Sequence, residues 1–214
     1  MTFQTSSPRP PVAVDTCDLI TLRQSLLDLF CEAAYKEGEF TLSSGQTSRY
    51  YINGKLVTLH PWGGLACGRL LLAQVPAEAV AVAGLTLGAD PLVTATSVVA
   101  AYEGRSLAAL IVRKEAKGHG TQAYIEGPVL PSGSPVVVLE DVVTTGQSAL
   151  KAVDRLRDAG YSVNHIISLV DRHQGAADLY HQEGLGFQAI FSITEIQSRW
   201  AERQQQAGSN DSSV

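Results

Sequence analysis

The chain lacks a long apolar run, a surplus of basic residues and a dense set of cysteines. Crossing a membrane takes about 18 or more consecutive apolar residues, and no such run occurs. The formal net charge of -5 argues against general nucleic-acid binding, because neutralising a phosphate backbone requires a basic surface. Cys17, Cys31 and Cys67 are widely spaced, which favours reduced, packed thiols in a cytoplasmic protein. We therefore expect neither a membrane nor a nucleic-acid partner.

The two ends of the chain show little apolar periodicity. The first residues lack the basic region and apolar stretch of a secretory signal. Residues 1–14 are rich in proline and predict a loose leader, and the polar residues 207–214 predict a disordered tail. Residues 15–206 contain no linker and enough apolar residues for one domain with a substantial core.

The middle of the chain alternates between apolar strands and helices. Residues 18–37 predict a helix that ends at Gly38, and residues 40–54 predict a hairpin or short strands. Further helices are predicted over 64–74, 91–104, 147–159, 174–182 and from 195, and strands over 79–84, 106–112, 135–140, 165–170 and 187–193. This alternation predicts an α/β fold with a mainly parallel central sheet flanked by helices. Ligands in such sheets bind beyond the carboxyl ends of the strands.

One predicted strand ends in two acids that precede a turn rich in hydroxyls, "VVVLEDVVTTGQS". The turn leads into a helix, whose free N–H groups and dipole favour a phosphate. Glu140 and Asp141 would repel that phosphate, but they suit sugar hydroxyls or a divalent cation beside it. The stretch matches neither a Walker loop nor a dinucleotide loop. A sugar-phosphate site fits these residues, and so does a capped helix that follows solvated acids.

A second segment, "RKEAKGHGTQAYIEG", gathers Arg113, Lys114, Lys117 and His119 within seven residues of an acidic chain. Its glycines and lack of apolar periodicity predict a loop and not a core element. It is either a solvated basic loop or a lid that closes on a polyphosphate and stabilises a leaving pyrophosphate.

Five stretches carry a resemblance to a known family. "VVVLEDVVTTGQS" resembles the signature of the type I phosphoribosyltransferases for phosphoribosyl pyrophosphate (PRPP), and R-K-E-x-K-x-H-G resembles the catalytic loop of the orotate phosphoribosyltransferases. "FTLSSGQTSRYYIN" resembles the segment that covers the orotate ring in that family. "GLTLGADPLVTATS" resembles its pyrophosphate loop, and "SLVDRHQGA" resembles its segment for the orotate carboxylate.

The resemblance implies the type I phosphoribosyltransferase fold, with residues 15–62 contributing to a small N-terminal hood. It implies the transfer of ribose 5-phosphate from PRPP to N1 of orotate, giving orotidine 5'-monophosphate and pyrophosphate for UMP synthesis. It further implies a cytoplasmic homodimer in which each lid reaches the partner's site, with Mg2+ held through PRPP and water and not directly by the protein. A purine-base phosphoribosyltransferase and a non-catalytic PRPP sensor are the alternatives.

The resemblance also assigns roles to individual residues. The catalytic residues would be Lys117, His119 and Asp141. PRPP would bind Arg113, Lys114, Lys117, His119, Glu140, Asp141, Val142, Val143, Thr144, Thr145, Gly146, Gln147 and Ser148. Orotate would bind Thr144, Arg172, Tyr51 and Ile52, and the pyrophosphate loop would be Thr86, Leu87, Gly88 and Ala89.

Two positions depart from the family pattern, because Ser43 and Gly88 stand where some members carry lysine. Backbone N–H groups of residues 86–89 or the Lys55 ammonium could compensate in part. Asp90 is predicted to be a helix N-cap before Pro91, or to bind a metal-bound water.

Overall fold

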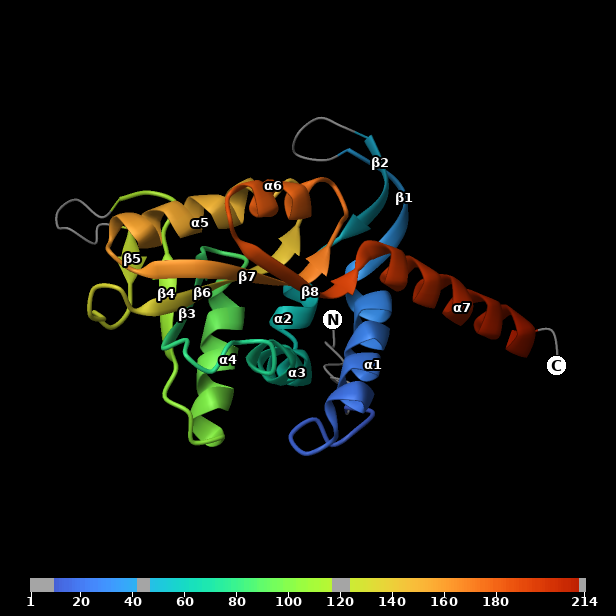
Figure 1. The fold of residues 1–214 in the computed structure, drawn as a ribbon. Helices are drawn as coiled ribbons and strands as arrows, with labels where there is room; N and C mark the ends of the chain where they lie inside the picture. Colours follow the sequence, from blue (N-terminus) through green and yellow to red (C-terminus); the bar gives the residue numbers. More distant parts are fainter. Residues whose placement is uncertain (1–9, 42–46, 117–123, 212–214) are drawn as a thin grey trace, which may run out of the picture.

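The computed structural model describes residues 10–41, 47–116 and 124–211 (Figure 1). Six strands form the main sheet in the order β5-β4-β3-β6-β7-β8. They are β3 (Ala81–Leu85), β4 (Ala108–Val112), β5 (Ile125–Glu126), β6 (Pro135–Val143), β7 (Ser162–Asp171) and β8 (Gly186–Ser192). All neighbouring pairs are parallel except β4 and β5. The predicted α/β class and mainly parallel sheet are confirmed.

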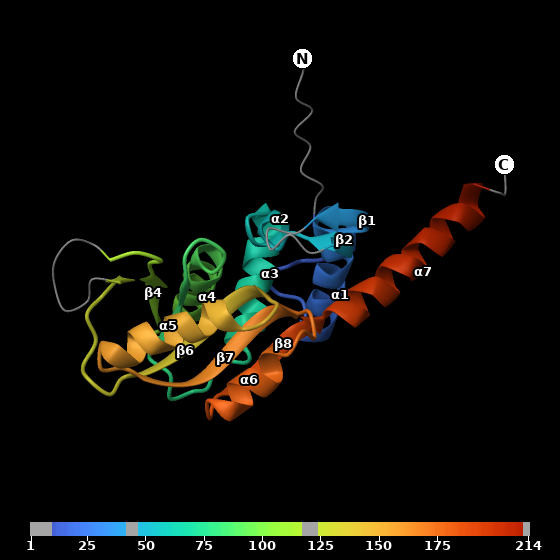
Figure 2. The same ribbon diagram turned by 90° about the horizontal axis from the view of Figure 1, so that it is seen from above.

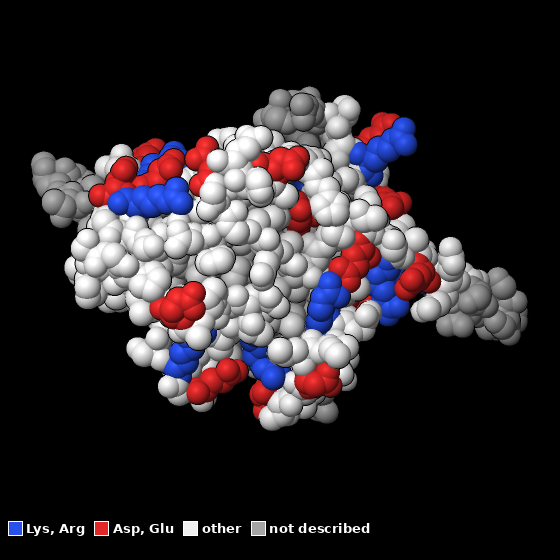
Figure 3. Space-filling model, in the orientation of Figure 1, with Lys and Arg blue, Asp and Glu red and all other residues white. Residues whose placement is uncertain are grey.

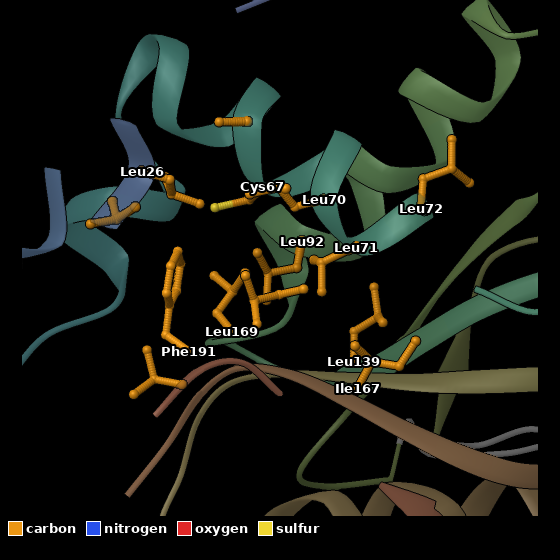
Figure 4. Close-up of a cluster of buried hydrophobic side chains, with 14 of the residues drawn as sticks. Leu26, Cys67, Leu70, Leu71, Leu72, Leu92, Leu139, Ile167, Leu169 and Phe191 are labelled. Atoms are coloured by element: carbon orange, nitrogen blue, oxygen red, sulfur yellow. The ribbon is translucent and has the colours of Figure 1, made fainter. Parts of the chain in front are cut away.

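Helices cover both faces of this sheet (Figure 1). One face packs against α3 (Pro61–Leu72) and α4 (Asp90–Tyr102), with α1 (Leu19–Leu29) beyond them, and the other against α5 (Gln147–Asp158) and α6 (Ala176–Gln182). The larger core lies on the α3 side, where Leu71, Leu139 and Ile167 are buried together (Figure 4). None of the described helices combines the length and the apolar character needed to cross a membrane.

A separate two-stranded sheet, β1 (Tyr35–Thr41) with β2 (Thr47–Ile52), forms the hood above the carboxyl ends of the main strands (Figure 1). The predicted helix over 18–37 is wrong at its end. The helix begins where predicted, and the Asp18 carboxylate accepts hydrogen bonds from the N–H groups of Ile20 and Thr21. The helix passes through a π turn, η1 (Phe30–Ala34), and Tyr35 then enters the strand. Pairing with β2 and burial of Tyr35 override the helical pattern.

The structure describes part of the predicted leader and part of the predicted tail. In the leader, Val14 is buried in the core, and its carbonyl accepts a hydrogen bond from Arg69. Residues 1–9 lie outside the described part. At the other end, α7 (Ile193–Asp211) continues into the predicted tail and projects from the body of the molecule (Figure 2).

Candidate functional site

The strand order reverses direction at β3. The chain leaves β3 for β4 on one side and returns to β6 on the other. In open α/β sheets, such a reversal opens a crevice beyond the carboxyl ends of the two central strands. Residues 86–89 form the loop that follows β3, and β6 carries the acidic pair near its carboxyl end. The fold therefore brings the predicted pyrophosphate loop and the predicted ribose site to one place.

Asp141 lies against the glycine of the pyrophosphate loop. A Cβ atom on Gly88 would fall 2.6 Å from Asp141 Oδ1, and one on Gly54 would fall 3.4 Å from Asp141 Oδ2. The N–H of Val142 donates to Asp141 Oδ1 at 2.8 Å. Two glycines and a backbone donor thus surround this carboxylate. The absence of a side chain at position 88 has a steric reason, because Asp141 occupies the space.

Both acids lie within β6, because the strand continues for three residues beyond its predicted end at Glu140. Successive side chains of a strand point to opposite faces. Asp141 faces Gly54 and Gly88, whereas Glu140 lines a cavity of about 80 Å³ with Tyr180 and the hydroxyl-rich turn. The carboxylates therefore serve different parts of the crevice.

The turn from Thr144 to Ser148 forms the other wall of that cavity. Gly146 has a φ of +86°, a conformation that favours glycine, and it immediately precedes α5. No side chain caps this helix, and Gln147, Ser148 and Ala149 of its first turn line the cavity. A small cavity at a helix N-terminus suits an anion, so the phosphate role predicted for this turn stays a prediction.

Tyr180 packs against the turn at Gly146. The sequence patterns did not indicate this residue. It is fully buried, and its Oη donates to the Gly146 carbonyl at 3.2 Å. A Cβ on Gly146 would lie 2.9 Å from the Tyr180 ring. Burial, with Glu140 and Asp171 nearby, raises the pKa of Tyr180, which keeps the hydroxyl protonated as a donor.

Glu140 is 7% exposed, and its Oε2 has no hydrogen-bond partner among the described residues. Burial raises the pKa of Glu140 to about 8, with a further contribution from Asp141, while Lys114 opposes the shift. An unpaired buried carboxylate oxygen is costly, so this group is suited to a ligand hydroxyl or cation.

Arg172 follows β7 and connects the main sheet to the hood. Its N–H donates to the Val143 carbonyl at 3.0 Å, beside the turn. Its Nε donates to Tyr50 Oη at 3.0 Å, and its guanidinium lies 4.9 Å from the centre of that ring. Tyr50 is a second residue that the sequence analysis did not select, although the aromatic alternation in "SRYYI" contained it.

The predicted ring-covering residues Tyr51 and Ile52 lie on opposite faces of β2. Tyr51 is exposed and contacts the Phe40 ring at 5.6 Å, whereas Ile52 packs on the core. The two side chains therefore do not lie on the same face of the hood.

The basic segment is described only at its two ends. Arg113 forms an ion pair with Glu126 at 2.8 Å, and its carbonyl accepts a hydrogen bond from Arg155. Lys114 is exposed. Lys117 and His119 lie outside the described residues, as does Ser43, so their predicted roles stay predictions.

The predicted N-cap role of Asp90 is wrong. Asp90 is the first residue of α4, which has Ala89 as its N-cap, and its Oδ2 accepts a hydrogen bond from the Thr86 hydroxyl at 2.7 Å. The Asp90 carboxylate thus restrains the loop at residues 86–89 through Thr86. Lys55 lies across a cavity of about 590 Å³ that Leu87 and Asp90 also line.

Known proteins match this chain over most of its length. A family model for the phosphoribosyl transferase domain matches residues 71–198. A curated orotate phosphoribosyltransferase from Nostoc sp. is 64% identical over 203 residues, which cover 94% of this chain and 98% of that protein. The chain belongs to the orotate phosphoribosyltransferase family.

Other members of the family also match this chain over most of their length. The orotate phosphoribosyltransferase of Synechocystis sp. is 61% identical over 191 residues, covering 89% of this chain and 96% of that protein. The crystal structure of the Mycobacterium tuberculosis orotate phosphoribosyltransferase in complex with PRPP is 35% identical, with a TM-score of 0.68 and coverage of 82% and 98%. These matches confirm the predicted type I phosphoribosyltransferase fold and orotate phosphoribosyltransferase activity.

Proposed function

We propose that the crevice at the β3–β6 reversal transfers ribose 5-phosphate from PRPP to N1 of orotate with the help of Mg2+. The bond from C1' to the pyrophosphate oxygen breaks, a bond from N1 to C1' forms, and the proton of N1 is released to the pyrophosphate or to solvent. One observation carries this assignment to the crevice: Asp141 lies between the pyrophosphate loop and the start of the 5'-phosphate turn. A donor with a phosphate at each end of a ribose matches that arrangement.

The 5'-phosphate binds in the cavity at the start of α5. The N–H groups of residues 145–148 and the hydroxyls of Thr144, Thr145 and Ser148 are its donors, and the helix dipole adds to them. The pyrophosphate binds at residues 86–89, where Thr86, Leu87 and Gly88 are at least partly exposed. The ribose then spans the two sites, with its hydroxyls at Glu140 and Asp141.

The acidic pair also fits Mg2+. Carboxylate oxygens are ligands that Mg2+ prefers, and it commonly binds one or two of them together with substrate phosphates and water. Glu140 Oε2 is buried without a partner among the described residues, and Asp141 faces the pyrophosphate loop. When bound, the ion would offset negative charge on the departing pyrophosphate. The negative field of the two carboxylates would favour a ribose that becomes cationic as the bond breaks.

Orotate binds between the turn and the hood. Arg172 presents a guanidinium at the carboxyl end of β7, beside Thr144, and a guanidinium fork suits a carboxylate. Ile52, on the same face of β2 as Tyr50, and Tyr51, on the exposed face, remain the proposed contacts of the ring. Lys117 and His119 supply contacts that strengthen as the pyrophosphate leaves.

A homodimer is part of the proposal. Leu59, Leu65, Leu87 and Val98 expose between 38% and 68% of their surface around the cavity next to the pyrophosphate loop. Apolar surface of this kind favours a protein partner. Because Leu87 belongs to the loop itself, a second copy seated here would lie next to this site. The face shown in Figure 3 is mostly uncharged, and its basic groups lie beside acidic ones without a broad basic patch.

A cytoplasmic location is proposed as well, and three free cysteines support it.

The activity is tested by following the ultraviolet absorbance of orotate with PRPP and Mg2+ present. We expect consumption that stops when a chelator removes the divalent cation and resumes when Mg2+ is restored. Turnover of a purine base without turnover of orotate would contradict the proposal. An Asp141→Asn variant should lose most of the turnover, and Glu103→Gln, on the exposed end of α4, serves as the matched control.

A further inference from the structure

We infer that Tyr50 is a positioning residue that fixes the guanidinium of Arg172 for the orotate carboxylate. The inference rests on the role proposed above for Arg172. It adds a residue of the hood to the determinants of specificity for a carboxylate-bearing base.

The backbone of Arg172 is held by the main sheet. Its N–H donates to the carbonyl of Val143, and the next residue is held in a tight turn. In that turn, the N–H of His173 donates to Asp171 Oδ1 at 2.8 Å, and His173 has a φ of +53°. The sheet therefore fixes where the side chain starts, but it does not fix where the guanidinium points.

The hood fixes the guanidinium. Tyr50 is 122 residues away in sequence, and its Oη accepts the hydrogen bond from Arg172 Nε. The same ring lies under the guanidinium, so the contact combines a hydrogen bond with a cation–π interaction. An arginine side chain has many rotamers, and holding one of them before binding lowers the entropy lost when the ligand arrives.

The hydrogen bond to Tyr50 involves Nε of the guanidinium and does not involve Nη1 or Nη2. Among the described residues, Nη1 and Nη2 of Arg172 have no hydrogen-bond partner. These two nitrogens form one of the edges through which a guanidinium binds a carboxylate in a bidentate pair. Tyr50 thus occupies the Nε position and keeps the Nη edge available.

Tyr50 is itself held by an aromatic stack that reaches α7. Its ring is stacked on Tyr35 with centroids 5.9 Å apart, and Tyr35 meets Trp200 edge-on at 5.9 Å. The Ser48 hydroxyl donates to the Tyr50 carbonyl at 2.7 Å. A residue held by a ring stack and a hydrogen bond is suited to positioning another, because its own conformation is restricted.

The test compares Tyr50→Phe with Tyr35→Phe in steady-state kinetics, with melting temperature as the check on folding. Tyr50→Phe keeps the ring and removes the acceptor. We expect the KM for orotate to rise about tenfold, with kcat and the KM for PRPP within about twofold. Tyr35→Phe makes the same change in the neighbouring ring of the stack, away from Arg172, and should leave the KM for orotate within about twofold.

Arg172→Lys and the double variant separate this inference from the proposed role of Arg172. We expect Arg172→Lys to raise the KM for orotate about tenfold or more, and Tyr50→Phe to add nothing in that background. A KM unchanged by Arg172→Lys overturns the role of Arg172 and this inference together. If Arg172→Lys has its effect but Tyr50→Phe resembles Tyr35→Phe, or its effect is additive, only the inference is overturned.

Discussion

Gly88 and Asp141 share one space in the crevice: a Cβ on the glycine would lie 2.6 Å from the carboxylate oxygen. This contact accounts for one departure from the family pattern. A lysine at position 88 would require Asp141 to move, so this chain combines a bare pyrophosphate loop with a closely placed carboxylate. Donors on the loop must then come from the backbone.

Gly88→Ala is the smallest test of that contact. The added methyl should push the Asp141 carboxylate away from the loop and lower kcat/KM for PRPP about tenfold or more, since small displacements in a site are costly to catalysis. The melting temperature should change little, because the change lies in an exposed crevice. Gly208→Ala, on α7, where an added Cβ meets no atom within 4 Å, should leave activity unchanged. Equal kinetics for the two variants would rule out the steric account.

Glu140 should make the substrate-free protein less stable as pH rises. The pKa of about 8 means that the folded chain binds this proton more tightly than the unfolded chain, whose pKa is near 4.5. In that window the folded state holds more protons, so the free energy of unfolding falls with increasing pH. Relative to the wild type, Glu140→Gln should gain up to about 4 kcal/mol between pH 5 and pH 8.

Urea unfolding at several pH values measures this difference. Glu103→Gln, an exposed change of the same type, should show a constant offset from the wild type. A constant offset for Glu140→Gln as well would show that Glu140 titrates near its ordinary pKa.

Tyr180 and Gly146 should act as one unit in holding the 5'-phosphate turn. Tyr180→Phe removes the donor to the Gly146 carbonyl and should cost about 1 kcal/mol of stability while raising the KM for PRPP. Gly146→Ala adds a methyl against the Tyr180 ring at a φ of +86° and should cost about 1 to 3 kcal/mol. Denaturant unfolding and initial rates at varied PRPP measure both. Effects on the KM for orotate alone would contradict this assignment.

The order of elements could be predicted from the sequence because it depends on local pattern. The apolar strands before residues 86, 113, 144 and 172 each ended near the predicted point, and strand ends of a parallel sheet meet at one edge. The direction of single side chains depends on register instead. The exact length of β6 decides that Glu140 and Asp141 face different walls, and an end predicted at residue 140 concealed this.

Long-range contacts set the remaining features. Residues 35–37 continue a helical pattern, and only pairing with residues 50–52 makes them a strand. Tyr50 and Tyr51 are the same residue type in adjacent positions. Only the packing of β2 on the core turns Tyr50 toward Arg172. Asp90 has the sequence position of an N-cap, but the Thr86 hydroxyl binds its carboxylate.

Subunit mixing tests the shared lid. Lys117→Ala should abolish most activity through the lid, and Asp141→Asn should abolish it through the crevice. If each lid completes the partner's site, a mixed dimer has one site with both defects and one with neither. Random exchange of equal amounts makes about half of the dimers mixed, so about one quarter of the wild-type activity should return.

The result depends on geometry and not on stability, which makes it decisive for the homodimer proposal. A lid that closed on its own subunit would leave every site in the mixed dimer with one defect, and no activity would return. Mixing Lys117→Ala with Lys117→Ala protein carrying Gly208→Ala controls for concentration and handling, because no site in that mixture regains its lysine. Recovery in the first mixture alone places the lid of one subunit over the Asp141 of the other.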